Sequence, residues 1–383
     1  MPPEDAGVRG QGPGVGEQAD HGFAEGRYDA VGAALARAVA GQRLEPAEIQ
    51  RLFDEASLHA LGAAASQVRQ RLNPGREVTY IIDRNINYTN VCVYRCRFCA
   101  FYRKPGDPDA YVLPFEAIAG KVEETIGAGG TGLLLQGGVH PDLRLDFYEG
   151  LLRQLKARFP AIHLHAFSAP EIHFIAKVER LPLAEVIARL RVAGLESIPG
   201  GGAEVLEDET RRRIWSRAKA STEQWLEVHR EAHRQGMRTT ATMMFGVGEP
   251  IAARVEHLLR VRELQDESGG FTAFIPWTFQ EENTAMDGEV ATSGGFDYLR
   301  TLAIARLALD NVGHVQGSWV TQGPKVGQLS LFFGADDLGS IMLEENVVAA
   351  AGARHTMTRA EMERVITDAG FTPRQRRTLY EPL

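Results

Sequence analysis

The sequence contains little cysteine: only three of its 383 residues are of this type. All three lie in the string CVYRCRFC at 92–99. The disulfide framework of a secreted protein needs an even and dispersed set of cysteines, so this sequence excludes one. Thiols grouped this closely indicate a ligand cluster, and therefore a reducing compartment.

Long apolar runs and basic blocks are also missing. No stretch of about 18 apolar residues occurs, so we expect no membrane-spanning helix. The first 22 residues have no apolar core of the kind found in signal peptides. The net charge is −8, and the basic strings at 211–213 and 374–377 are short. We therefore expect a cytoplasmic protein that acts on a small molecule, with neither nucleic acid nor membrane as a partner.

Composition divides the chain into four segments. Residues 1–26 are rich in glycine, proline and acidic residues, which predicts a disordered tail. Residues 27–76 have apolar positions three and four apart, which predicts an N-terminal helical segment. Residues 77–345 are predicted to form one α/β barrel domain. Residues 346–383 are predicted to be a C-terminal helical extension packed on that barrel.

Short apolar or β-branched stretches alternate with amphipathic helical ones along the barrel domain. Strands are predicted at 78–83, 131–138, 162–168, 195–201, 238–246, 271–279, 314–320 and 329–335. Eight strands separated by helices favour an α/β fold with a (β/α)8 barrel of the TIM type, and an open doubly wound sheet is the rival. Barrel active sites lie at the carboxyl ends of the strands, where the cysteines and several glycine-rich strings also fall.

Cys92, Cys96 and Cys99 suit iron in a sulfide cluster. A 4Fe–4S cubane has four irons, so three cysteines leave one iron open to another ligand. A structural zinc would need a fourth ligand, and the first histidine downstream is His140. An iron–sulfur electron carrier or sensor, the alternative that is not an enzyme, would normally supply a fourth cysteine.

The spacing CxxxCxxC, followed by the aromatic-rich string AFYR, resembles the signature of the radical S-adenosylmethionine (SAM) superfamily. The likeness covers nearly the whole chain, and it implies a TIM-like radical SAM barrel with an N-terminal helical extension. It also implies one 4Fe–4S cluster held by Cys92, Cys96 and Cys99, with SAM bound at the open iron. One electron would then cleave SAM and release a 5′-deoxyadenosyl radical.

The same resemblance assigns cofactor-binding residues. Phe98 occupies the aromatic position that packs against the adenine of SAM, and Met243 lies in a motif that flanks it. The string QGG at 136–138 resembles the strand end that contacts the methionine amino group. Ser168 and Glu204 are candidates for the SAM ribose, with helix capping as the alternative. The residues predicted to bind the cofactor are Phe98, Gln136, Gly137, Gly138, Ser168, Glu204 and Met243.

Longer strings resemble one branch of the superfamily, the enzymes of the menaquinone futalosine pathway. The strings CAFYR at 99–103, HAFSAPEI at 165–172 and FTAFIPWTFQ at 271–280 are more similar to the cyclic dehypoxanthine futalosine synthase family than to aminofutalosine synthases. The deazaflavin-forming FO synthases are more distant relatives.

This branch implies dehypoxanthine futalosine as the small-molecule substrate. The 5′-deoxyadenosyl radical would take the C4′ hydrogen of its ribose, and the sugar radical would add to the benzoate ring. Loss of one electron and one proton would complete the cyclisation. The resemblance also implies a reducing electron donor such as flavodoxin or ferredoxin.

Three side chains are predicted to be catalytic. His165 lies near the end of the third predicted strand, where it would act as a base or a hydrogen-bond donor, although a core histidine is the alternative. Glu171 follows the same strand, and a helix cap is its alternative. Tyr102 comes directly after the cysteine string.

Five further residues are predicted to bind the substrate. Amides and hydroxyls are unusually frequent just before the cysteines, Arg103 follows them, and two side chains end the sixth predicted strand. Core packing is the alternative for the tryptophan. The substrate-binding candidates are Asn87, Asn90, Arg103, Trp277 and Gln280.

Overall fold

The computed structural model describes residues 22–215 and 219–383, with side chains described from residue 29 onward. The predicted tail at 1–26 falls mostly outside these residues, since only 22–26 are described, as the first turns of helix α1 (Gly22–Val39).

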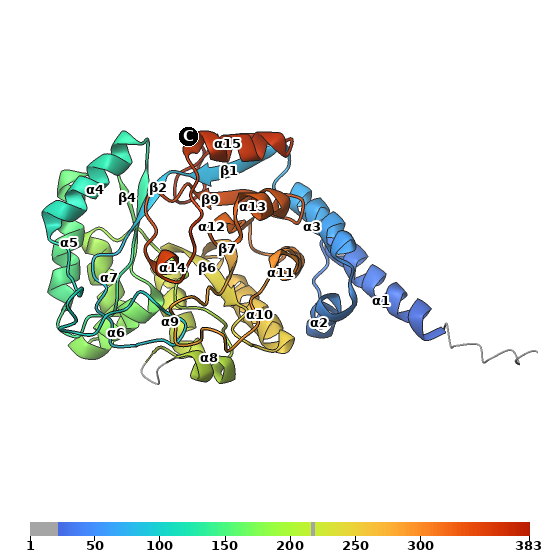
Figure 1. The fold of residues 1–383 in the computed structure, drawn as a ribbon, viewed down its shortest axis with the longest axis horizontal. Coiled ribbons are helices and arrows are strands. Elements are labelled where there is room, and N and C mark those ends of the chain that lie inside the picture. Colours follow the sequence, from blue (N-terminus) through green and yellow to red (C-terminus); the bar gives the residue numbers. More distant parts are fainter. Residues whose placement is uncertain (1–21, 216–218) are drawn as a thin grey trace, which may run out of the picture.

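Three helices precede the barrel: α1, α2 (Pro46–Glu55) and α3 (Leu58–Leu72). A capping box between Glu45 and Glu48 starts α2, and Ser57 caps α3 by accepting a hydrogen bond from the Ala60 amide. The apolar face of α3 packs against α11 (Gly295–Ala308), so these helices cover one side of the barrel (Figure 1). The helical segment predicted from the spacing of apolar residues is present.

Seven parallel strands form one curled sheet in the order β2 to β8, so each strand pairs with the next one along the chain. Their bounds are β2 (Asp83–Ile86), β3 (Gly132–Leu135), β4 (His163–Ala166), β5 (Ser197–Ile198), β6 (Arg238–Phe245), β7 (Phe271–Thr278) and β8 (His314–Val315). Every pair is in parallel register, which requires a crossover helix after each strand.

The crossover helices lie on the outside of this sheet (Figure 1). They are α4 (Phe115–Gly127), α5 (Leu145–Arg158), α6 (Ala169–Glu179), α7 (Leu183–Ala193), α8 (Asp208–Ile214), α9 (Thr222–Arg234), α10 (Ile251–Ser268) and α11. Buried leucine, isoleucine and valine side chains of these helices form one continuous core with the strands. The alternation of strands and helices confirms the predicted α/β barrel class.

A second parallel sheet, in the order β10 (Thr372–Gln375), β1 (Glu77–Ile81) and β9 (Asp337–Ser340), completes the ring. β1 runs on into β2 with only Ile82 between them, and a parallel bridge from Gln316 to Asp337 connects the end of β8 to β9. The eighth strand of the barrel is therefore β9.

The strand predicted at 329–335 is wrong. These residues form the end of α13 (Pro324–Ser330) and a following turn. Pro324 is at the first helical position, where its fixed φ suits a helix start. The strand predicted at 314–320 is likewise shorter, because its second half is α12 (Trp319–Gln322).

The segment 346–383 is not purely helical. It contains α14 (Val347–Ala350) and α15 (Arg359–Asp368), but it also supplies β10, which pairs with β1. After β10 the chain turns under the barrel, so that Arg376, Thr378 and Tyr380 line its interior.

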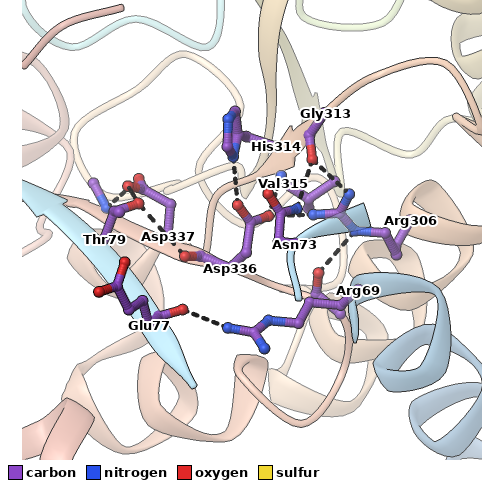
Figure 2. Close-up of polar contacts among 12 residues, drawn as sticks. Arg69, Asn73, Glu77, Thr79, Arg306, Gly313, His314, Val315, Asp336 and Asp337 are labelled. Atoms are coloured by element: carbon purple, nitrogen blue, oxygen red, sulfur yellow. Dashed lines mark hydrogen bonds and ion pairs between the residues drawn. The ribbon is translucent and has the colours of Figure 1, made fainter. Parts of the chain in front are cut away.

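A buried ionic network joins α3, α11, β8 and β9 at this closed end of the barrel (Figure 2). The guanidinium of Arg306 pairs with Asp336, whose other oxygen lies 2.6 Å from Nδ1 of His314. Burial alone would raise the pKa of Asp336, but Arg306 and His314 hold that pKa below its ordinary value. Arg376 forms a second buried pair with Asp337, through two hydrogen bonds of 2.6 and 2.8 Å.

Candidate active site

The cysteine loop follows β2 and is fastened to the open end of the barrel by backbone hydrogen bonds. The Cys92 amide donates to the Arg103 carbonyl at 3.0 Å, and the Arg103 amide donates to the Asn90 carbonyl at 2.8 Å. The Val93 amide donates to the Val139 carbonyl at the end of β3. These bonds hold both ends of the loop, so the cysteines project from a fixed base.

The three thiols are sheltered from solvent. Cys96 is buried, and Cys92 and Cys99 are half-buried. Burial raises the pKa of Cys96 to about 12, while the nearby Lys219 ammonium acts in the opposite direction. The backbone amides of Phe101 and Tyr102 hydrogen-bond to Cys99 and act to lower its pKa, although its burial outweighs them. Amide donors around a thiolate are typical of iron–sulfur ligation.

The arrangement of the three cysteines differs from that of ligands around a single metal ion. Among residues 22–215 and 219–383, no three His, Cys, Asp or Glu side chains converge as the ligands of one metal ion would. In a cubane each cysteine binds a different iron, so the three sulfurs need not converge. Their placement around one loop therefore fits a three-cysteine cluster in its donor chemistry.

Two glycines let the end of β3 approach the cysteine loop. A Cβ added to Gly138 would lie 2.3 Å from the Val91 carbonyl oxygen, and one added to Gly137 would lie 2.6 Å from the Tyr88 ring. The Gly138 amide donates to the Thr89 carbonyl at 2.8 Å. The glycines of QGG therefore position the loop itself, while the Gln136 side chain lines the barrel cavity.

Glu171 and Ser168 form the capping box of α6. Glu171 accepts hydrogen bonds from the Ser168 amide, the Ser168 hydroxyl and the Gly137 amide, at 2.7, 2.6 and 3.1 Å. It also accepts one from the Tyr88 hydroxyl at 2.6 Å. Both carboxylate oxygens are thus engaged, and the side chain is only 3% exposed. This is the capping alternative for Glu171, which positions the loop and does not line the cavity.

Glu204 is the carboxylate that faces the cysteines with a free oxygen. Its φ is 42°, a region that non-glycine residues rarely adopt. Its Oε1 is 2.7 Å from the Lys219 ammonium, and both side chains are buried. Its Oε2 is buried and has no hydrogen-bond partner among the described residues. A buried carboxylate oxygen without a donor is costly, so it marks a place for a ligand hydroxyl.

Lys219 lies among aromatic rings beside this carboxylate. Its ammonium is 5.0 Å from the Phe98 ring centroid and 4.6 Å from that of Trp215. Burial would lower the pKa of Lys219, but Cys96 and Glu204 together raise it above its ordinary value. The residues around the cysteines therefore supply a positive charge, an acceptor for hydroxyls and the predicted aromatic ring of Phe98.

A cavity of about 290 Å³ occupies the interior of the barrel. His165, Gln136 and Trp277 of the predicted set line it, together with Asn85 and Thr242. A separate hollow of about 40 Å³ beside Cys99 is lined by Phe98, Gln280 and Trp277, among others. Because Trp277 borders both spaces, the cysteine loop and the cavity are adjacent, and the cavity has the size of a small-molecule site.

An amide network forms one wall of the cavity. The Asn85 amide donates to Glu345 at 2.9 Å, and the Asn87 amide donates to the Gln136 carbonyl at 3.1 Å. The Asn346 amide donates to the Asn87 side-chain oxygen at 3.1 Å. Burial raises the pKa of Glu345, although Asn85 and two backbone amides act against this rise. Asn87 thus supports the cavity wall, and Asn85 faces the cavity.

His165 projects into the cavity from β4. Its Nδ1 lies 2.6 Å from the hydroxyl of Ser197 on β5, and the same hydroxyl lies 2.7 Å from Nε2 of His163. Burial lowers the pKa of His165 to about 3, with His163 and Arg376 adding to this effect. His165 is therefore a neutral imidazole at physiological pH.

The remaining predicted residues are not brought together in the cavity. Asn90 joins the loop at 109–111 by donating to the Asp109 carbonyl and accepting from the Tyr111 amide. Arg103 pairs with Asp109 at 2.6 Å and donates to three carbonyls at 100–102, including that of Tyr102. Asn90, Arg103 and the backbone carbonyl of Tyr102 therefore shape the cysteine loop.

Met243 lies on the wrong face of β6 for a cofactor contact. It is fully buried in the core, whereas Thr242 lines the cavity and donates to the Gly200 carbonyl at 2.7 Å. Side chains alternate across a strand, so only one of these two neighbours can face inward.

Sequence reasoning missed several residues that line the cavity. Alternation along β6 could have identified Thr240 and Thr242 as a pair on one face. Arg376 and Tyr380 reach the barrel interior only because β10 docks beside β1, and no local pattern signals that contact. Glu345 enters from the segment before α14.

A parallel barrel with three clustered cysteines after its first strand and a cavity beneath them defines the class of radical SAM enzymes. Residues 86–261 match the model of the radical SAM superfamily, and residues 268–383 match the CofH/MqnC C-terminal region. The crystal structure of methylornithine synthase (PylB) is similar with a TM-score of 0.69 at 19% identity, covering 89% of this chain and 97% of that one. At this identity the likeness shows the fold alone.

Comparison with curated relatives shows which family within the radical SAM class this chain belongs to. The cyclic dehypoxanthine futalosine synthase of Halalkalibacterium halodurans is 48% identical over 91% of this chain and 93% of its own length. The synthase of the same name from Streptomyces coelicolor is 49% identical over 91% and 88%. An aminodeoxyfutalosine synthase of Thermus thermophilus is 39% identical over 89% and 92%. The chain belongs to the radical SAM family that contains the cyclic dehypoxanthine futalosine synthases.

Among the described residues, the helices are all too short or too polar to cross a membrane.

Proposed function

We propose that this enzyme converts dehypoxanthine futalosine to cyclic dehypoxanthine futalosine in menaquinone biosynthesis. The observation that carries the proposal is the 48–49% identity to two synthases of that name over 91% of the chain. Identity to an aminodeoxyfutalosine synthase is lower, at 39%. The resemblance of the strings at 99–103, 165–172 and 271–280 to the cyclic dehypoxanthine futalosine synthases supports the same substrate.

Cys92, Cys96 and Cys99 would hold a 4Fe–4S cluster, and the iron that they leave open would bind SAM. The chemistry supplied there is one-electron cleavage of the S–C5′ bond, which yields methionine and a 5′-deoxyadenosyl radical. The chain's own contribution is to fix the loop and to keep water away from the thiols. The backbone bonds of Cys92 and Arg103, and the burial of Cys96, support this role.

The residues around the cysteines would position SAM. Glu204 offers its unpartnered Oε2 to ribose hydroxyls, and Phe98 offers a ring face to the adenine. Lys219 would balance the negative charge of the thiolates and of Glu204. Ser168 and Glu171 would act indirectly, because they hold the end of β3 through the Gly137 amide.

The substrate would occupy the barrel cavity beneath this site. Trp277 would contact its aromatic ring, Asn85 and Thr242 would bind its hydroxyl groups, and Gln280 would border the approach to Cys99. Hydrogen abstraction from C4′ of the ribose and attack on the benzoate ring leave one electron and one proton to be removed. His165, a neutral imidazole in the cavity wall, would accept the proton. A flavodoxin or ferredoxin would supply the reducing electron.

The test is anaerobic turnover of the reconstituted enzyme with SAM, dithionite and dehypoxanthine futalosine. We expect 5′-deoxyadenosine and a product two hydrogens lighter than the substrate, both detected by mass spectrometry. Both should disappear in the Cys96→Ala variant, together with the cluster absorbance. Formation of 5′-deoxyadenosine with unchanged substrate would refute the proposed substrate, and the enolpyruvyl ether used by aminofutalosine synthases would be tried next.

A further inference from the structure

Two histidines and one serine form a continuous hydrogen-bonded chain in the barrel wall. His165 Nδ1 and His163 Nε2 lie 2.6 and 2.7 Å from the same Ser197 hydroxyl oxygen. Ser197 itself is fully buried and pairs with His165 across β4 and β5. His165 lines the cavity, whereas His163 lies two residues nearer the closed end of the barrel.

A hydroxyl group has a single hydrogen, so Ser197 can donate to only one of these histidines. If both contacts are hydrogen bonds between neutral groups, the other histidine must donate to Ser197. Two orders satisfy this condition, because either histidine can be the donor. In one of them His165 Nδ1–H donates to Ser197 and the Ser197 O–H donates to His163 Nε2, and only in this order does Nε2 of His165 carry a lone pair.

The surroundings keep the chain neutral. Burial lowers the pKa of both histidines, that of His165 to about 3. Arg376 acts on His165 in the same direction. Around His163, Lys156 lowers its pKa, whereas Glu196 and Glu381 act to raise it. The charged groups that act on the two histidines thus differ: the carboxylates of Glu196 and Glu381 act on His163, whereas the Arg376 guanidinium acts on His165.

We propose that Ser197 and His163 act with His165 as a proton relay, which removes from the barrel the proton that cyclisation releases. The inference rests on the proposed function. His165 Nε2 takes the proton from the cyclised radical as its C–H bond breaks, and His165 Nδ1–H passes to Ser197. The Ser197 proton passes to His163 Nε2, and His163 Nδ1–H passes to water. The electron of the broken bond would need a one-electron acceptor, which an oxidised 4Fe–4S cluster held by Cys92, Cys96 and Cys99 would supply.

The relay solves a problem that His165 alone would face. A proton that stayed on His165 would leave an imidazolium at a buried position whose pKa is about 3. With the relay, each of the three side chains loses one proton for the one that it gains, so no charge remains in the barrel wall. The transfer leaves a proton on Nε2 of each histidine, so the first state returns only when both rings move their proton back to Nδ1 by exchange with water and the Ser197 hydroxyl rotates. In these terms His165 is the catalytic residue, and Ser197 and His163 are positioning residues.

The variants Ser197→Ala and His163→Phe interrupt the chain, and Ser197→Thr keeps its hydroxyl. We expect Ser197→Ala to slow product formation about a hundredfold, the scale of one acid–base group. 5′-Deoxyadenosine formation should continue, so its ratio to product should rise above one, with a substrate-derived radical accumulating in freeze-quenched EPR samples. Ser197→Thr should restore the ratio. The double variant Ser197→Ala/His163→Phe should lose no more activity than either single variant, because both substitutions interrupt the same hydrogen-bonded chain.

The matched control is a histidine with the same kind of partners outside the cavity. His233 lies 2.6 Å from the Ser268 hydroxyl and 2.7 Å from that of Thr239. Thr239→Val should leave the ratio at one. Equal loss of 5′-deoxyadenosine and product in Ser197→Ala, with KM raised and kcat unchanged, would overturn the relay.

A second readout does not need the substrate. In ¹⁵N-histidine NMR spectra of the holoenzyme, His165 and His163 should each carry a single proton, on Nδ1, and Ser197→Ala should shift both sets of signals. If His165 carries two protons, or its proton on Nε2 alone, the relay is refuted. If the wild type fails to convert dehypoxanthine futalosine, the proposed function fails, and these spectra still decide whether the chain exists.

Discussion

The two ends of the barrel differ in how completely their buried carboxylates are paired. At the closed end, Asp336 is held by Arg306 and His314, and Asp337 by Arg376 and the Thr79 hydroxyl. At the open end, Glu204 keeps an oxygen without a partner among the described residues. Both aspartates of the closed end are therefore paired with arginine, whereas the open end leaves a carboxylate oxygen available for a ligand.

This difference separates stability from function within one fold. At the closed end, pairing of the buried aspartates stabilises the folded protein, because an unpaired buried charge lowers the free energy of unfolding by several kcal/mol. At the open end the same cost is tolerated where binding of a ligand can offset it. Variants of Arg306, His165 and Glu204 test this difference between the two ends.

Arg306→Met should destabilise the protein by about 3–5 kcal/mol, because it leaves Asp336 buried without its cation. Urea unfolding followed by circular dichroism measures this change. Activity per folded molecule should stay the same, since Arg306 does not line the cavity. The control is Arg158→Gln, whose ion pairs with Glu116 and Glu123 are exposed and screened by water, so it should change stability far less. If Arg306→Met and Arg158→Gln lost the same amount of stability, the buried ion pair of the closed end would contribute no more than an exposed one.

The sequence predicts those parts of the arrangement that depend on neighbouring residues, and it misses those that depend on residues far apart in the chain. The cysteine loop, the QGG strand end and seven of the eight barrel strands follow from local spacing and alternation. The eighth strand, β9, does not, because DDLGS at 336–340 looks like a polar turn. It is a buried strand only because Arg306 and Arg376, from distant parts of the chain, neutralise its aspartates.

The same reasoning explains the site residues. The string SAPE at 168–171 matches the S-x-x-E pattern of a capping box, so the role of Glu171 is readable from local sequence. Whether Thr242 or Met243 faces inward depends on how β6 is set against its neighbours, and alternation alone does not decide it. Tyr380 reaches the cavity through a chain reversal after β10, which is a contact of long range.

The pH dependence of stability tests the same difference at His165, which is half-buried in the cavity wall and has no carboxylate among the groups that shift its pKa. Its folded-state pKa of about 3 lies below the ordinary value of 6.5. The unfolded chain therefore binds a proton below pH 6.5 that the folded protein does not, and stability falls as the pH drops from 6.5 towards 3. Between pH 7 and pH 5 this residue alone should cost about 2 kcal/mol. Anaerobic urea unfolding at both pH values measures it.

His165→Gln should remove that part of the pH dependence, so that its stability falls by about 2 kcal/mol less than that of the wild type over the same interval. The background for this measurement is His59→Gln, which changes an exposed histidine of α3. If the wild type and His165→Gln lose stability in parallel, the folded-state pKa of His165 equals its ordinary value of 6.5, and the depression of that pKa by burial is refuted.

The smallest expected effect concerns Glu204, whose free oxygen distinguishes the open end from the closed one. Glu204→Gln keeps the shape of the side chain but replaces one acceptor oxygen by a donor and removes the charge facing Lys219. We expect SAM to bind about tenfold more weakly to the reconstituted enzyme, or about 1.4 kcal/mol, measured by isothermal titration calorimetry. Glu207→Gln makes the same change three residues later, where the side chain caps α8. It should leave SAM affinity unchanged, because its oxygens already accept from the Glu209 and Thr210 amides. Equal affinities of the Glu204→Gln variant and the wild type would show that the unpartnered oxygen is a defect of packing and not a place for SAM.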